Sequence, residues 1–137
     1  AEAGIRDAQE SRGLGDVYKR QRLQARLIGR YLKASKIRFS EILTSEWCRC
    51  IDTTKELNLG NWKIFSGLNS FFEGHEKKDT VKAKLRRKLA SLKTSDLALF
   101  VTHQVVITEL MDEVPRSGEM VLYNSITKKK SRFMIDF

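Results

Sequence analysis

The sequence predicts an α/β domain, organised as a three-layer α/β/α sandwich around a mostly parallel sheet. Stretches with apolar residues at helical spacing alternate with short apolar runs of strand length, which is the pattern of a layered α/β fold. The run at 97–101 is continuously apolar, as expected of a central parallel strand that helices cover on both faces. A length of 137 residues, 41% of them hydrophobic, suits one compact domain with a real core.

The composition excludes several classes of protein. The longest apolar runs are far shorter than the roughly 20 residues that cross a bilayer, so no membrane span is predicted. Cys48 and Cys50 are two positions apart on a predicted helix and do not share a face, so no disulfide between them is expected. We expect neither a metal site nor a cofactor. The compartment (cytoplasm or periplasm) and the oligomeric state stay open.

Residues 1–21 differ in character from the rest of the chain. They hold four basic and four acidic residues and show no apolar periodicity. The segment 13–21 resembles a run that recurs at the ends of unrelated environmental shotgun sequences. We therefore expect 1–21 to be a non-native leader, irregular or disordered, and 22–137 to form the domain. An ordinary polar N-terminal arm is the alternative.

The first half of the domain predicts two helices and two strands. Apolar residues at helical spacing indicate a helix over 22–33, and a short apolar run indicates a strand over 41–44. A second helix is expected over 46–57, with Ser45 as its N-cap and Asn58 and Gly60 at its end. A second short strand is expected at 62–65, followed by a loop over 67–74.

The sequence of the second half predicts two helices, one of them basic, and three more strands. In the helix at 76–92, Val81, Leu85, Leu89 and Leu92 form an apolar stripe, and basic residues cover the opposite face. The strand at 97–101 is followed by a helix over 103–110. Strand candidates at 119–123 and 132–137 are expected to pair through the intervening turn.

Chemistry is predicted at two junctions of the same kind. A strand ending at Thr44 leads into a helix whose first turn holds Arg49, and a strand ending at Val101 leads to His103. Ligands of open α/β sheets bind at the carboxyl ends of strands, where helix N-termini present free N–H groups. Arginine suits a phosphate group, and histidine can contact a phosphoryl oxygen or move a proton. We therefore expect Arg49 and His103 to line one phosphate-sized cleft.

Four segments together resemble the histidine phosphatase (phosphoglycerate mutase-like) superfamily. They are 43–53, which fits the signature TSxWCRCxDTA of a bacterial branch, then 68–72 (LNSFF), 101–108 (compare VTHQVNITAL) and 117–121. The resemblance spans about 22–123, and the order of the motifs is more specific than any one of them.

The resemblance implies a phosphate-ester hydrolase that acts through a phosphohistidine intermediate on a phosphorylated small molecule or a phosphoprotein. Arg49 matches the arginine that grips the phosphoryl group, and His103 matches the second histidine of the same pocket. Thr102 and Asn69 match positions that supply further phosphate contacts. Glu73 falls where the superfamily often has a proton donor, although a solvated loop carboxylate is the alternative. Gln104 flanks His103, and 117–118 resembles a loop near the pocket rim.

The sequence also departs from the superfamily. The first strand of these enzymes ends in Arg-His-Gly or Arg-His-Ala, and that histidine is the nucleophile; no such motif occurs here. His75 follows Gly74 in a polar loop and has no preceding arginine. Val106 stands where the branch has Asn, and Glu109 where it has Ala. We therefore expect a chain without its first strand or nucleophile, nearly inactive, and with a central slot in the sheet.

The net charge of +9 allows a second interpretation. Residues 76–93 hold eight basic residues and two acidic ones, which could attract nucleic acid or another polyanion. The absence of a nucleic-acid-binding motif and of interleaved aromatic residues disfavours nucleic acid and favours a solvated helix face. A non-catalytic domain that binds phosphorylated ligands is a further alternative.

Overall fold

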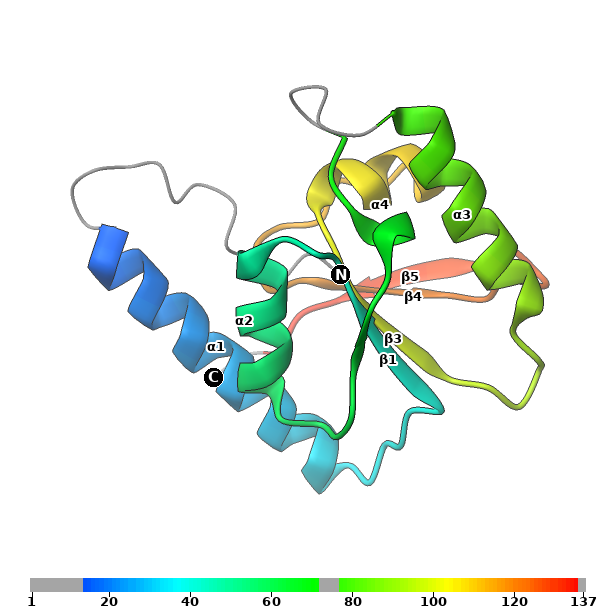
Figure 1. The fold of residues 1–137 in the computed structure, drawn as a ribbon. Coiled ribbons are helices and arrows are strands. Elements are labelled where there is room, and N and C mark those ends of the chain that lie inside the picture. The colour runs from blue at the N-terminus through cyan, green and yellow to red at the C-terminus, as the bar shows by residue number, and fades with distance from the viewer. Residues whose placement is uncertain (1–13, 72–76, 136–137) are drawn as a thin grey trace.

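A computed structural model of the chain describes residues 14–71 and 77–135. Four α-helices are present in this part: α1 (Leu14–Ala34), α2 (Cys48–Leu57), α3 (Lys78–Ser91) and α4 (Gln104–Met111). A short 3-10 helix, η1, covers Ser66–Leu68. The strands are β1 (Glu41–Thr44), β2 (Lys63–Ile64), β3 (Ala98–Val101), β4 (Met120–Tyr123) and β5 (Lys130–Phe133). The chain therefore has a mixed α/β fold, as the sequence predicts (Figure 1).

The strands form two separate groups. A parallel sheet has the order β2-β1-β3, and β4 pairs with β5 in an antiparallel hairpin. The register places Thr44 at the end of β1 opposite Val101 at the end of β3. The loop segments that follow these two strands therefore start side by side. The predicted pairing of the last two strands is confirmed, although β5 ends at Phe133.

Two apolar clusters form the core, and alternate residues of the strands point to different clusters. Helices α1 and α2 pack on Ile42, Leu99 and Val101. Helices α3 and α4, with η1, pack on Leu43 and Phe100. Figure 1 shows α1 beside α2 on one side of the sheet and α3 near α4 on the other. The apolar stripe predicted for the basic helix is confirmed at Val81 and Leu85, which are buried, and at Leu89, which packs on the second cluster.

The position predicted for the strand at 97–101 is wrong. In the described residues β3 lies at the edge of the parallel sheet, and β1 is the central strand. Helices do cover both faces of β3, because Leu99 and Val101 contact one cluster and Phe100 the other. A continuous apolar run indicates that helices cover both faces of the strand. It contains no information on whether another strand pairs along the edge.

Two predicted helix boundaries also differ from the structure. Helix α1 begins at Leu14, so residues 14–21 are helical and the expectation of an irregular leader is wrong there. Residues 1–13 lie outside the described part of the chain. Helix α2 begins at Cys48 with Trp47 at its N-cap position, whereas the sequence predicts Ser45 there. At the other end Asn58 adopts the left-handed conformation (φ 52°), as expected of a C-cap residue.

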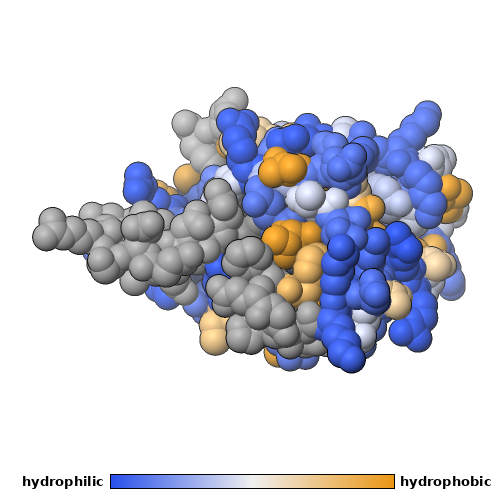
Figure 2. All heavy atoms as spheres, turned by 90° about the horizontal axis from the view of Figure 1, so that it is seen from above, coloured by the Kyte–Doolittle hydropathy of each residue, from blue (hydrophilic) through white to orange (hydrophobic). Residues whose placement is uncertain are grey.

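No helix in the described residues is both long and apolar enough to cross a membrane. Helix α1 has 21 residues, but polar and charged side chains occupy one of its faces. Figure 2, which views the molecule from above, shows that the described residues on this face are mainly hydrophilic, with small hydrophobic patches between them. Cys48 and Cys50 are both free thiols, in agreement with the prediction from their spacing.

Gly29 allows α1 and α2 to pack closely. A Cβ atom at this position would lie 2.0 Å from the carbonyl oxygen of Leu57, and neither helix can yield without losing core contacts. We expect Gly29→Ala to lower the free energy of unfolding by about 1–3 kcal/mol, although alanine favours a helix over glycine. Urea denaturation followed by circular dichroism measures this change. Ala34→Gly, at the exposed end of the same helix, is the control for helix propensity, and an equally stable or more stable Gly29→Ala variant would contradict the packing argument.

Candidate functional site

The two junctions singled out in the sequence adjoin at the carboxyl end of the parallel sheet. Their backbones are linked, because the N–H of Ser45 donates a hydrogen bond to the carbonyl oxygen of Val101 at 3.1 Å. His103 stands at the N-cap position of α4, and Arg49 lies in the first turn of α2. The predicted proximity of the two junctions is confirmed.

A buried hydrogen-bond network joins them. The Ser45 Oγ atom lies 2.9 Å from His103 Nε2 and donates to Asn69 Oδ1 at 3.1 Å. The backbone N–H of Glu46 also donates to Asn69 Oδ1 (2.9 Å), and that of Trp47 donates to Ser45 Oγ (3.2 Å). Ser45, Asn69 and His103 are exposed by only 0%, 2% and 2%, so the network is shielded from water.

The network determines which ring nitrogen of His103 holds the proton. A backbone N–H can only donate, so the atom that accepts from Glu46 is the Asn69 oxygen, and Ser45 must give its hydroxyl proton to that oxygen. The Ser45 oxygen then accepts from His103, which requires a proton on Nε2. Because the imidazole donates to Ser45, it does not act as a base toward this hydroxyl. A serine nucleophile activated by histidine is therefore excluded for this pair in this state.

Burial and, to a smaller extent, the positive charge of Arg49 together lower the pKa of His103 to about 3. The ring is neutral at neutral pH as a consequence. It can donate one N–H to an oxygen atom, but it brings no permanent positive charge to the site. An anion bound nearby would oppose the effect of Arg49 and favour the protonated ring.

Trp47 separates Arg49 from His103 and contacts both. The Arg49 guanidinium carbon lies 5.0 Å from the centroid of the Trp47 ring, a cation–π contact. The Trp47 ring meets the His103 ring edge-on, with centroids 4.9 Å apart and an angle of 68° between the planes. The Cys50 sulfur lies 3.6 Å from His103 Nε2. The sequence predicts no role for Trp47 or Cys50 in the site, and it predicts Ser45 only as a helix cap.

The described residues close around His103, whereas the sequence predicts a cleft there. Cavities of about 30 and 560 Å³ occur in the described part of the chain, and neither is lined by Arg49 or His103. The larger cavity reaches Thr102, the residue before His103. The ring is enclosed because Trp47 and Cys50 pack directly against it.

The polar residues around His103 bind protein groups. The Thr102 hydroxyl donates to the carbonyl oxygen of Leu68 at 2.7 Å, which ties the end of β3 to η1. Gln104 Nε2 donates to the carbonyl oxygen of Pro115 at 2.8 Å. Asn69 holds the 45–46 turn, as described above. These contacts position the site, and phosphate contacts by Thr102 and Asn69 stay predictions.

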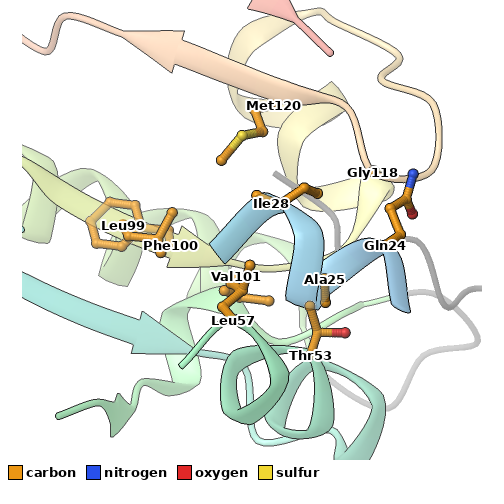
Figure 3. A pocket seen from close by; sticks show the side chains of 10 residues that line it. All are labelled: Gln24, Ala25, Ile28, Thr53, Leu57, Leu99, Phe100, Val101, Gly118 and Met120. Atoms are coloured by element: carbon orange, nitrogen blue, oxygen red, sulfur yellow. The ribbon is translucent and has the colours of Figure 1, made fainter. Parts of the chain in front are cut away.

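Two predicted residues lie outside the described part of the chain, and a third lines the smaller cavity. Glu73, the proposed proton donor, and His75 are both outside the described part of the chain. Gly118 adopts a positive φ of 78° and lies against Gln24 of α1, where both line the smaller cavity (Figure 3). Within 14–71 and 77–135, no group of three or more His, Cys, Asp or Glu side chains is arranged to hold a metal ion.

Acidic side chains neutralise part of the basic helix. Lys78 and Lys82 of α3 bind Glu109 of α4 at 3.2 and 2.9 Å, and Lys88 binds Glu41 at 2.6 Å. Lys84 donates to the hydroxyl of Ser66. These lysines attach α3 to its neighbours. These contacts favour a structural role for the basic residues of α3 over the binding of a polyanion.

No family model matches the chain, and neither a curated protein nor a solved structure is similar enough to it to count as a match.

Proposed function

We propose that the chain contains the phosphate-binding part of a phosphate-ester hydrolase that works through a phosphohistidine intermediate. One observation supports this function most strongly. Arg49 and His103, from adjacent parallel strand ends, flank the same Trp47 ring, and the charge of the arginine reaches the imidazole. An arginine next to a histidine at such an edge suits a phosphoryl group. The motif order at 43–53, 68–72 and 101–108 supports the same function.

We further infer that the complete domain is a three-layer α/β/α sandwich. Helices α1 and α2 belong to one apolar cluster and α3 and α4 to another, and residues of β1 and β3 contribute to both. The carboxyl ends of β1 and β3 lie at one edge of this sheet, and α2 and α4 begin after them.

In the proposed reaction a histidine on a strand that this sequence lacks attacks phosphorus, and water then hydrolyses the phosphohistidine. Arg49 donates two N–H hydrogen bonds to equatorial oxygens of the phosphoryl group. The Nε2–H of His103 exchanges its hydrogen bond to Ser45 for one to another equatorial oxygen. Developing charge on these oxygens raises the affinity of His103 for a second proton. Positioning and charge neutralisation supply most of the rate enhancement in phosphoryl transfer. The chain as given would bind the phosphoryl group with little turnover.

Binding of phenyl phosphate tests the proposal on the chain as it exists. We expect Arg49→Ala to weaken binding about 10- to 100-fold, because a charge-assisted hydrogen bond contributes roughly 1.5–3 kcal/mol. Isothermal titration calorimetry measures the dissociation constant. Arg86→Ala is the matched control, since it removes the same charge from an exposed position on α3. Equal losses in the two variants would favour the alternative, non-specific attraction of anions to a basic surface.

A further inference from the structure

The Trp47 side chain closes the candidate site in the described part of the chain. Its ring meets the His103 ring edge-on, with 4.9 Å between the centroids, and the Arg49 guanidinium carbon lies 5.0 Å from the centroid of the Trp47 ring. His103 is only 2% exposed, and neither Arg49 nor His103 lines a cavity found among the described residues. A solute that contacts both side chains at once therefore needs the space that the Trp47 ring occupies.

Trp47 is also the side chain around His103 that is best placed to move. Ser45 and Cys50, which contact the same imidazole, are 0% and 2% exposed and lie in the interior, whereas Trp47 is half-buried. The backbone of Trp47 is fixed at the start of α2, because its carbonyl oxygen accepts from the N–H groups of Cys50 and Ile51 at 3.0 and 3.1 Å. Rotation about the side-chain torsions can therefore carry the ring away from His103 while the helix stays in place.

An oxyanion can displace the Trp47 ring because it competes with the ring for Arg49. A cation–π contact at a partly exposed site is weaker than the two charge-assisted hydrogen bonds that a guanidinium donates to a phosphate. A phosphate group therefore draws Arg49 out of its contact with Trp47, and the ring loses one of the contacts that keep it over the site. An uncharged solute forms no such hydrogen bonds and leaves the contact intact.

We infer that Trp47 is a gate that determines which ligands reach His103. The gate is closed in the chain without ligand and opens when an oxyanion binds the Arg49 guanidinium, so the site admits phosphate groups and excludes uncharged groups of the same shape. The closed gate also lowers the apparent affinity for phosphate, because binding must shift the ring to a less populated position. The identity of the ligand rests on the proposed function, whereas the closure of Trp47 over His103 does not.

Chemical modification of His103 tests the closed gate in the absence of any ligand. Diethyl pyrocarbonate reacts with accessible neutral imidazoles, and peptide mass spectrometry distinguishes His103 from His75, the other histidine of the chain. We expect Trp47→Ala to raise the modification rate of His103 at least about tenfold, because removal of the ring exposes the imidazole, and Trp47→Phe to keep the rate low.

Trp62→Ala is the matched control for this experiment. It truncates the other tryptophan of the chain, which is also half-buried and packs on the apolar cluster of α1 and α2. The modification rate of His103 should stay unchanged in this variant. An equal rise in Trp62→Ala, or no rise in Trp47→Ala, would overturn the inference.

The fluorescence of Trp47 tests the opening of the gate by phosphate. The chain has two tryptophans, so Trp62→Phe leaves Trp47 as the sole indole. We expect saturating inorganic phosphate to raise the acrylamide quenching constant of Trp47 about twofold or more, because the ring moves into water. Trimethyl phosphate, which has a similar shape but no charge, should leave the constant unchanged. Arg49→Ala in the same background should abolish the response to phosphate.

Calorimetry with phenyl phosphate distinguishes the gate from the proposed function. We expect Trp47→Ala to bind phenyl phosphate at least about threefold more tightly than the unchanged chain. Binding without a change in Trp47 quenching, or an equal response to trimethyl phosphate, would overturn the gate and leave the proposed function intact. No binding in any variant would overturn the proposed function and the opening by phosphate, whereas the modification rates of His103 would still show whether Trp47 covers the ring.

Discussion

An apolar strand ending in Arg-His-Gly, joined directly ahead of residue 22, should raise hydrolysis of p-nitrophenyl phosphate by about six powers of ten over the chain as given. The reason is chemical. In the proposed function Arg49 and His103 bind and stabilise a phosphoryl group but neither supplies the nucleophile, and removal of a catalytic nucleophile can cost an enzyme about this factor. A second version joins the strand ahead of Leu14, because α1 begins there. The measurement is the release of p-nitrophenol under substrate saturation.

The controls for this experiment distinguish the effect of the added nucleophile from the effect of the added strand on folding. The same strand ending in Arg-Gln-Gly should leave the rate near that of the unchanged chain, while circular dichroism shows equal folding. Phosphohistidine should be trapped by acid-free quenching only in the version with Arg-His-Gly. Robust turnover by the unchanged chain, abolished by His75→Ala, would show that the nucleophile was misplaced and that the chain needs no added strand.

Acid should destabilise the protein well above the pH at which its carboxylates titrate. An unfolded histidine titrates near pH 6.5, whereas burial and Arg49 hold the pKa of His103 at about 3 in the folded chain. Between these values the unfolded state binds a proton that the folded state does not bind, so the free energy of unfolding falls as the pH falls. The contribution is fully present above about pH 6.5. As the pH falls below this value, the free energy of unfolding decreases by up to about 1.4 kcal/mol per pH unit. The total decrease reaches on the order of 4 kcal/mol near pH 3.

Urea denaturation between pH 7.5 and 4.5 measures this dependence, with His103→Gln as the comparison. Glutamine keeps an N–H donor for Ser45 and cannot titrate, so the variant should lose the slope between pH 6.5 and 4.5, although its stability at pH 7.5 is lower. His75 is the other histidine in the chain, and His75→Gln controls for its own titration. A slope that is unchanged in His103→Gln and absent in His75→Gln would contradict the buried, neutral state of His103.

The candidate site could be predicted in part. Arg49 and His103 follow apolar runs that indicate strands, and parallel strands place such residues at one edge of a sheet. The role of Ser45 could not be predicted in the same way. Its hydroxyl contacts Asn69 and His103, which are 24 and 58 positions away, and only the packing of η1 and β3 beside β1 brings the three together. The low pKa of His103 likewise depends on the contacts of Trp47 and Cys50 with the ring.

The amino-acid sequence alone determined the local elements of this protein. Apolar runs identified the strands at 41–44 and 97–101, and apolar spacing identified the apolar face of α3. Asn58 marked the end of α2. Each of these depends on residues within a few positions of one another. The tertiary structure alone decided the order of the strands, the edge position of β3 in the described residues and the cavity of about 560 Å³ that it lines. Strand order depends on pairing between segments far apart in the chain, and an apolar run is equally suited to a central strand and to an edge strand that helices cover on both faces.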